Sequence, residues 1–193
     1  MQDHLNDAFI FLGSNVERER NYLEALRRLV ELGTLRAVSP VYETAPIGSC
    51  CEYFYNGAAR LETPLNASAL RLALRRIEAQ LGRVRTADRN APRTIDLDLV
   101  LFNKEQLTGP GWQIPDPLIF KRPFMAQALA ELDPAYVHPV AGRTLAELAG
   151  AETAAETEAS SGTNENLTRV DPAMTARVRD WFDHLYVGEI SHA

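Results

Sequence analysis

The feature that most constrains this chain is the segment 94–102, which reads TIDLDLVLF. Polar and apolar residues alternate at first and then give way to a fully apolar run, a pattern typical of a strand that enters a buried sheet. Side chains two positions apart on a strand point to the same face. We therefore expect Asp96 and Asp98 to project together. The opposite face would meet the core through Ile95, Leu97, Leu99 and Leu101.

The paired carboxylates of Asp96 and Asp98 indicate a metal site. Their Cα atoms would lie roughly 6.5 to 7 Å apart, and two such charges repel each other unless a cation sits between them. Magnesium binds carboxylates, water and phosphates. Two magnesium ions can bridge a phosphate donor and lower the pKa of an attacking hydroxyl. For an isolated pair of aspartates, an ordinary solvated strand face is the alternative.

A basic segment precedes this strand and carries Arg83, Arg85, Arg89 and Arg93. The guanidinium group offers a fixed fork of donors that matches phosphate oxygens. A basic loop that leads into a strand with two carboxylates favours metal-assisted phosphoryl transfer. Charge alone also allows a plain solvated loop.

The remaining patterns predict an α+β domain. Strands are expected at 8–12, 35–44, 54–62 and 94–102, and amphipathic helices at 17–32 and 70–81. The order strand, helix, strand, strand, helix, strand is that of a ferredoxin-like βαββαβ core. In such a core, helices cover one face of an antiparallel sheet. Additional helices are expected towards the C-terminus, and 45–53 and 113–117 are expected to be loops.

Three regions are expected along the chain. Residues 1–149 would form the domain, with a short helix at 122–132. Residues 150–166 are rich in Ala, Glu, Thr, Ser and Gly, which predicts a flexible linker. Residues 167–193 would be a C-terminal extension, helical through Trp181 and Phe182. That helix could pack back on the domain, dock a partner or contribute to a dimer. We otherwise expect a monomer.

Composition excludes several classes of protein. A general nucleic-acid binder is more often basic overall, because it must neutralise phosphates, so the formal charge of −6 argues against this class. The N-terminus lacks the pattern of a signal peptide, and no apolar run approaches the roughly 20 residues that span a bilayer. Two adjacent cysteines, Cys50 and Cys51, offer no disulfide framework. We expect a cytoplasmic protein with no membrane contact.

Other functional motifs are absent from the sequence. It contains no P-loop, no dinucleotide-binding glycine pattern and no cysteine or histidine cluster of the kind that binds zinc. An RNA-binding ferredoxin-like domain would carry aromatic residues on the central strand where Asp96 and Asp98 stand.

Residues 89–100 (RNAPRTIDLDLV) closely resemble the signature of the 6-hydroxymethyl-7,8-dihydropterin pyrophosphokinase family. The resemblance covers about residues 8–149. Further matching segments are FLGSN at 11–15, VYET at 41–44, YNGA at 55–58, IEAQLGRVR at 77–85 and the stretch 131–139. The resemblance implies an ATP-dependent diphosphotransferase that makes the pterin diphosphate and AMP in folate biosynthesis.

The resemblance also implies a role for each matching position. Asp96 and Asp98 would hold two Mg²⁺ ions, and Arg83 and Arg93 would assist the transfer. The residues expected to contact ATP are Glu78, Arg85, Arg89, Arg93, Leu99 and Arg122. Thr44 and Asn56 would hydrogen-bond the edge of the pterin, and Phe54 and Phe124 would stack on its ring.

Several positions depart from the family pattern. Asn90 stands where tryptophan is common, and Asp116 stands where a histidine usually contacts the nucleotide phosphates. Arg75, Gly111 and Gln113 also differ from the usual residues. Three explanations are open: a slower enzyme of the same kind, a changed nucleotide or acceptor, or a divergent paralogue that binds pterin or nucleotide with little turnover.

Overall fold

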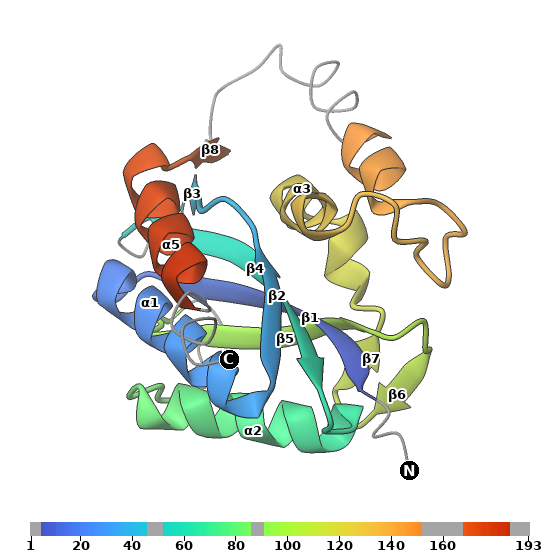
Figure 1. Ribbon diagram of the computed structural model, residues 1–193, viewed down its shortest axis with the longest axis horizontal. Helices are drawn as coiled ribbons and strands as arrows, with labels where there is room; N and C mark the ends of the chain where they lie inside the picture. The colour runs from blue at the N-terminus through green and yellow to red at the C-terminus, as the bar shows by residue number, and fades with distance from the viewer. Residues whose placement is uncertain (1–4, 46–51, 86–90, 152–167, 186–193) are drawn as a thin grey trace, which may run out of the picture.

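A mixed antiparallel sheet and helix architecture is seen in the computed structural model, which describes residues 5–45, 52–85, 91–151 and 168–185 (Figure 1). Within these ranges one sheet has the order β5-β1-β4-β3-β8, and β2 also pairs with β4. Its strands are β1 (Asn6–Ser14), β2 (Thr34–Val38), β3 (Tyr42–Thr44), β4 (Phe54–Thr63), β5 (Asp96–Phe102) and β8 (Thr168–Val170). The predicted order of strands and helices through 94–102 is confirmed.

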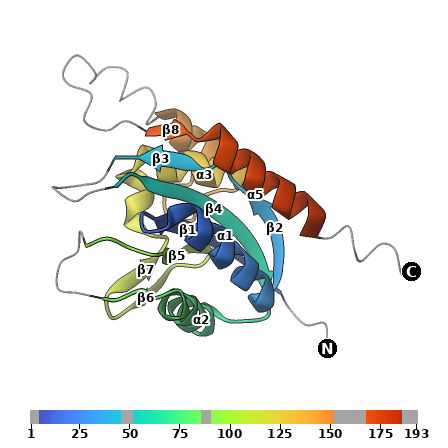
Figure 2. The same ribbon diagram turned by 90° about the vertical axis from the view of Figure 1, so that its left-hand side faces the viewer.

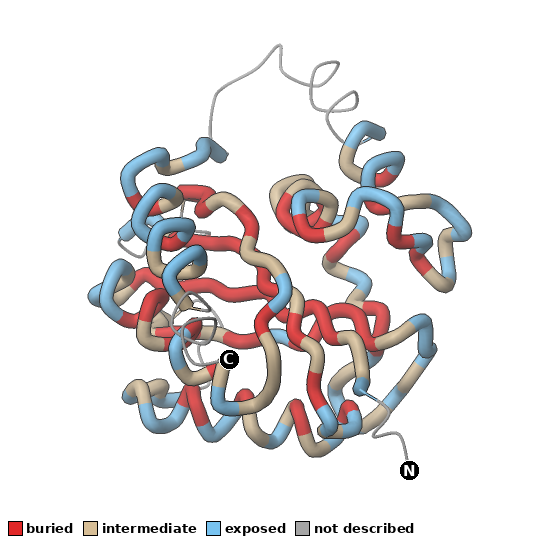
Figure 3. Tube along the Cα trace, viewed as in Figure 1, coloured by how far each residue is buried: buried red, intermediate tan, exposed pale blue. Residues whose placement is uncertain are grey.

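Helices cover both faces of the sheet, so the expectation of one covered face is wrong. One core lies between the sheet and α1 (Arg18–Leu29) and α2 (Ala67–Gln80). A second core lies against α3 (Pro123–Leu132) and a helix at 145–151. Buried residues run along the strands between these layers (Figure 3). The fully apolar end of the 94–102 segment reflects this burial on two sides.

A β-bulge in β5 changes which side chains share a face. Phe9 of β1 pairs with Leu101, whereas the next residue, Ile10, pairs with Leu99, so Val100 is the extra residue. Leu97 and Leu99 lie in the core of α1 and α2, but Leu101 lies in the core of α3. The prediction that Leu101 shares the face of Leu97 and Leu99 is therefore wrong.

The predicted strand at 35–44 is divided into β2 and β3, both of which pair with β4. Ser39 lies between them, and its hydroxyl accepts a hydrogen bond from the Ala58 backbone at 2.8 Å. The helix expected at 70–81 begins earlier, because Asn66 caps α2 and its side chain accepts from Ala69 N at 2.9 Å. That arrangement is an ordinary N-cap.

Residues 107–114 form a small hairpin of β6 (Leu107–Gly109) and β7 (Trp112–Ile114), which the sequence analysis did not predict. The first two residues of the expected loop at 113–117 belong to β7. A short 3-10 helix, η2 (Pro117–Phe120), follows. Another, η1 (Val30–Leu32), extends α1.

The C-terminal extension packs back on the domain. The helix that begins at 145 continues through residue 151, so 150 and 151 are not linker, and the rest of the expected linker lies outside the described residues. β8 then joins the sheet, and α5 (Pro172–Leu185) lies beside α1 and β2 (Figures 1 and 2). No helix among the described residues is both long and apolar enough to cross a bilayer.

Candidate active site

One face of the sheet carries both predicted metal ligands and the predicted pterin contacts of β3 and β4. On β5, Asp96 pairs with Gly13 and Asp98 pairs with Phe11 of β1. On the other side of β1, Gly13 pairs with Asn56 of β4. Because Phe11 belongs to the core against α3, both aspartates and Asn56 point towards the α3 side. The expectation that Asp96 and Asp98 project together from one face is confirmed.

Arginines surround the first aspartate. Arg93 Nη1 lies 2.7 Å from one carboxylate oxygen of Asp96, and Arg83 Nη2 lies 3.5 Å from the other. The Nε atom of Arg83 is buried and has no hydrogen-bond partner among the described residues. A buried donor without a partner is unfavourable, so it is suited to a substrate oxygen.

Asp98 experiences a concentration of negative charge. Loss of hydration, together with the charges of Asp96, Asp116 and Glu78, raises the pKa of Asp98 to about 7. Asp98 is exposed as a residue, so repulsion by the neighbouring carboxylates matters more at this position than the loss of hydration. A cation would relieve that repulsion. No group of three or more acidic, histidine or cysteine residues is arranged for a metal in the part of the chain that the structure describes. A cation here would depend on the two aspartates and on substrate oxygens.

Glu78 joins α2 to the start of β5. It is 2 % exposed, and its carboxylate accepts hydrogen bonds from Leu97 N at 2.9 Å and from Arg85 at 2.5 Å. Burial raises its pKa, and the charge of Asp96 adds to that effect. Glu78 therefore holds Arg85 towards the site, while its second oxygen fixes the β5 backbone beside Asp96.

The turn after β1 holds the Arg93 segment in place. Asn15 Oδ1 accepts from Arg93 N at 2.6 Å, and Asn15 N donates to Arg93 O at 3.0 Å. The Ser14 hydroxyl donates to Thr94 O at 2.6 Å. Neither Ser14 nor Asn15 was a predicted site residue. A polar Ser-Asn pair at the end of a buried strand was the available signal.

The predicted acceptor side lies on β3 and β4. Asn56 Nδ2 donates to Thr44 Oγ1 at 2.7 Å, and both residues are buried. Phe54 lies two positions before Asn56, on the same face of β4, and is half-buried. Phe124 of α3 faces Phe11, with ring centroids 6.0 Å apart. Phe11, which the sequence analysis left out, is thus an additional aromatic wall.

The other predicted contacts are more scattered. Leu99 is buried in the core with α1 and α2, and Arg122 is the half-buried N-cap residue that precedes α3. Arg89 and the departing residue Asn90 lie outside the described residues. Asp116 caps η2, because its carboxylate accepts from Leu118 N at 2.8 Å. The Asp116 departure therefore has a structural role as well as a charge effect on Asp98.

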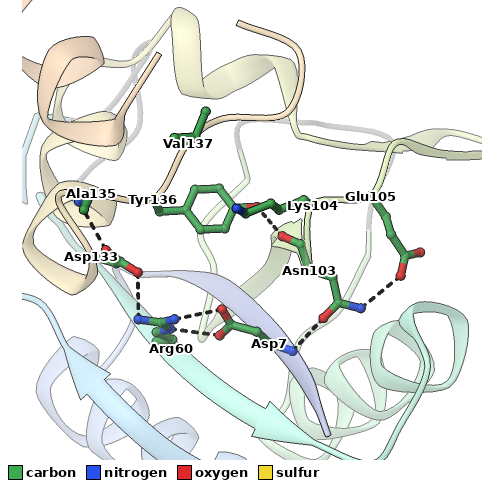
Figure 4. A pocket seen from close by; sticks show the side chains of 9 residues that line it. All are labelled: Asp7, Arg60, Asn103, Lys104, Glu105, Asp133, Ala135, Tyr136 and Val137. Carbon is green, nitrogen blue, oxygen red and sulfur yellow. Dashed lines mark hydrogen bonds and ion pairs between the residues drawn. The ribbon is translucent and has the colours of Figure 1, made fainter. Parts of the chain in front are cut away.

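A separate cavity of about 580 Å³ opens at the other end of β1 (Figure 4). Its lining residues are Asp7, Arg60, Asn103, Lys104, Glu105, Asp133, Ala135, Tyr136 and Val137. Arg60 donates to both carboxylate oxygens of Asp7 and to Asp133, all at 2.9 Å. These three groups pair with one another, and none of the lining residues is a predicted site residue, so this cavity is separate from the site above.

An acidic pair on an antiparallel sheet, with Arg83 and Arg93 beside its first member, defines the class of protein as an enzyme of phosphoryl transfer. The family model of 7,8-dihydro-6-hydroxymethylpterin-pyrophosphokinase (HPPK) matches residues 9–134. The chain belongs to this family, and it is a pyrophosphokinase of folate biosynthesis.

Relatives and solved structures agree with this assignment. The chain is 38% identical over 131 residues to the 2-amino-4-hydroxy-6-hydroxymethyldihydropteridine pyrophosphokinase of Bacillus subtilis, covering 66% of this chain and 78% of that one. It is 40% identical over 148 residues to the Pseudomonas aeruginosa protein of the same name, covering 74% and 90%. A Plasmodium falciparum HPPK-DHPS structure superposes with a TM-score of 0.67 at 18% identity, covering 84% of this chain and 48% of that one. This last similarity supports the fold.

Proposed function

We propose that the face shared by Asp96, Asp98, Gly13 and Asn56 is where pyrophosphate passes from ATP to 6-hydroxymethyl-7,8-dihydropterin. The observation that carries the proposal is the pairing of Gly13 with Asp96 on one side and Asn56 on the other. Neighbouring strands lie about 4.8 Å apart, so Asp96 and Asn56 are separated by roughly 10 Å. No side chain stands between them on β1, which leaves room for the reacting groups.

The acceptor would lie over β4. Asn56 and Thr44 would present an amide and a hydroxyl to the edge of the pterin, while Phe54 and Phe124 would flank its flat ring. Offset aromatic contacts contribute about 0.5 to 1.5 kcal/mol beyond burial. This orientation would point the hydroxymethyl group across Gly13 towards Asp96.

The donor would lie over β5 and the arginine loop. Asp96 and Asp98 would hold two Mg²⁺ ions, which would neutralise the ATP phosphates and activate the acceptor hydroxyl. The crowding of charge around Asp98 and the partnerless Nε of Arg83 fit such a polyphosphate complex. Arg85, Arg89 and Arg122 would bind the rest of the nucleotide.

In the reaction, the pterin hydroxymethyl oxygen attacks the β-phosphorus of ATP. A new oxygen–phosphorus bond forms, the bond from the β-phosphorus to the bridging oxygen of the α-phosphate breaks, and AMP leaves. The hydroxyl proton passes to solvent. Arg83 and Arg93 stabilise the charge that develops on the transferred group. Asn15 contributes indirectly, since it holds the Arg93 backbone in position.

We also propose that the fold has a ferredoxin-like core. The strand order β5-β1-β4-β3, with helices after β1 and β4, supports a ferredoxin-like core that α3, the 145–151 helix and α5 extend. The predictions of a monomer and of a cytoplasmic location stay predictions.

The test is AMP formation from ATP and 6-hydroxymethyl-7,8-dihydropterin, with and without magnesium. We expect AMP that depends on both pterin and magnesium. Asp96→Ala and Asp98→Ala should each abolish turnover in a folded protein. Glu31→Ala, which removes an exposed acid from η1, should not. Near-normal turnover in either aspartate variant would defeat the assignment of the metal site.

A further inference from the structure

The C-terminal extension adds a strand to the edge of the sheet beside the acceptor residues. β8 pairs antiparallel with β3, with Thr168 opposite Thr44, Arg169 opposite Glu43 and Val170 opposite Tyr42. Both β8 and α5 lie beyond residues 9–134, which the family model matches. They therefore lie outside the segment that the family model matches.

The start of α5 fastens the chain just before β3. Asp171 N donates to Val41 O at 2.8 Å, and Val41 N donates to Thr175 Oγ1 at 2.9 Å. Met174 and Val178 are 2 % and 1 % exposed and belong to the core with α1. The backbone N–H and C=O of the buried residue Val41 are thus paired with Thr175 of α5 and with Asp171 just before it. Undocking of α5 would leave both groups without these partners.

Two side-chain contacts connect the C-terminal extension to the residues that precede Thr44 and Asn56, the proposed pterin contacts. Tyr55, next to Asn56, donates its hydroxyl to Asp171 Oδ2 at 2.9 Å. Glu43, next to Thr44, is 6 % exposed and accepts from Arg169 Nε at 2.8 Å.

Arg18 of α1 completes this arrangement. Its Nη1 lies 2.8 Å from Glu43 Oε1, and its guanidinium stacks 4.0 Å from the centre of the Tyr55 ring. Burial alone would raise the pKa of Glu43, but the hydrogen bonds from Arg169 and Arg18 bring that pKa below its usual value. Neighbouring residues on a strand point to opposite faces, so these contacts hold β3 and β4 from the face opposite to Thr44 and Asn56.

We propose that β8 and α5, residues 168–185, form a C-terminal clasp that positions the pterin-binding end of the active site. β3 has only three residues and would otherwise be a short edge strand, the kind of element that opens readily. The clasp gives it a neighbour on each side and fixes the Thr44–Asn56 pair relative to Asp96. Asp171 and Thr175 would be positioning residues, since their contacts are with Val41 and Tyr55 and not with the proposed pterin contacts. The inference rests on the proposed function of Thr44 and Asn56.

The first test compares two neighbouring residues of α5, one buried and one exposed, in the full-length protein. Val178→Ser removes a buried anchor, and Arg179→Ser changes an exposed residue of the same helix. We expect Val178→Ser to raise the KM for the pterin about fivefold or more, a change in binding that a loosened pocket would produce. The KM for ATP and kcat should stay within about twofold. Arg179→Ser should match the parent protein. A similar rise in both KM values together with a fall in kcat would overturn the proposal.

A gentler pair of variants covers the case in which Val178→Ser fails to fold. Thr175→Val keeps the shape of the side chain but removes the acceptor of Val41 N, whereas Thr175→Ser keeps the hydroxyl. We expect a selective rise in the pterin KM for Thr175→Val and rescue by Thr175→Ser. An unchanged pterin KM in folded Thr175→Val overturns the proposal.

Hydrogen exchange separates this inference from the proposed function. Exchange at the amides of residues 42–44 and 54–56 needs no turnover, so it reports on the clasp even if the wild-type protein makes no AMP. Faster exchange there in Thr175→Val, with unchanged exchange in β5, supports the clasp. Unchanged exchange at 42–44 refutes it. Absence of AMP from the wild-type protein would instead refute the proposed function.

Discussion

Gly13 and Asn56 face each other across β1 and β4, and a Cβ atom built at Gly13 would lie only 3.1 Å from Asn56 Oδ1. That is closer than ordinary van der Waals contact, so a methyl group there would displace the Asn56 amide. Because Asn56 also donates to Thr44, the disturbance would reach both proposed pterin contacts.

We therefore predict that Gly13→Ala raises the KM for the pterin about tenfold, which corresponds to about 1.4 kcal/mol of binding. The KM for ATP should change much less. Gly150→Ala is the matched control, because a Cβ at Gly150 meets nothing within 4 Å and the residue lies in a helix. That substitution should leave the kinetics unchanged and stabilise the protein by up to about 1 kcal/mol. Equal pterin KM values in Gly13→Ala and the parent protein would contradict the proposal that the missing side chain at Gly13 leaves room for the substrate.

The sequence predicted the placement of Asp96 and Asp98 because alternation on a strand is a local property. It did not reveal the bulge at Val100, since one extra apolar residue in an apolar run leaves no mark on the pattern. Nor did it reveal β8, which is exposed and three residues long. That strand forms because β3 offers a free edge, and such an edge exists only after the sheet has assembled. Tertiary context also decides that Asp116 caps η2.

The contact between Glu78 and Arg85 predicts a selective effect on nucleotide binding. Glu78→Gln keeps the oxygen that accepts from Leu97 N but replaces the charge that holds Arg85. We expect the KM for ATP to rise about tenfold, since an Arg–carboxylate pair is a charge-assisted contact.

Stability should change little in Glu78→Gln, because the amide also avoids the burial of a charge. Glu24→Gln provides the control, since Glu24 pairs with Arg28 on α1 at 3.2 Å, away from the site. Steady-state kinetics with ATP as the varied substrate and thermal unfolding would separate the two effects. An ATP KM equal in both variants would show that Arg85 does not need Glu78.

Asp116 separates a structural role from an electrostatic one. Asp116→Asn keeps the cap on Leu118 N and removes a negative charge near Asp98. We expect Asp116→Asn to bind magnesium-ATP a few-fold more tightly, since a neighbouring charge that is well screened by water contributes about 1 kcal/mol.

Asp116→Ala also removes the charge, but it loses the cap and should lose about 1 kcal/mol of stability. Titration of both variants with magnesium-ATP, followed by urea unfolding, distinguishes the two contributions. Weaker nucleotide binding by a stable Asp116→Asn protein would indicate that Asp116 helps to hold the cation instead of opposing the phosphates.

His138 predicts a dependence of stability on pH. It is fully buried, and its Nδ1 accepts from the backbone amides of Val140 and Ala141, each at 3.2 Å. Burial lowers the pKa of His138 below its usual 6.5. The unfolded chain therefore binds a proton at this position more readily than the folded one. By linkage, the free energy of unfolding should be fully retained above pH 6.5 and should fall as the pH drops below it.

His138→Asn tests this dependence, because the amide oxygen of asparagine can accept the same backbone hydrogen bonds but does not titrate. Urea unfolding of both proteins between pH 5 and 8 should give a flatter profile for the variant below about pH 6.5. His184 lies exposed on α5, where the backbone carbonyl and carboxylate of Asp180 raise its pKa, the opposite direction to His138: His184→Asn should not flatten the profile below pH 6.5. An identical slope in His138→Asn would mean that another group carries the pH dependence, and the buried neutral state of His138 would lose its support.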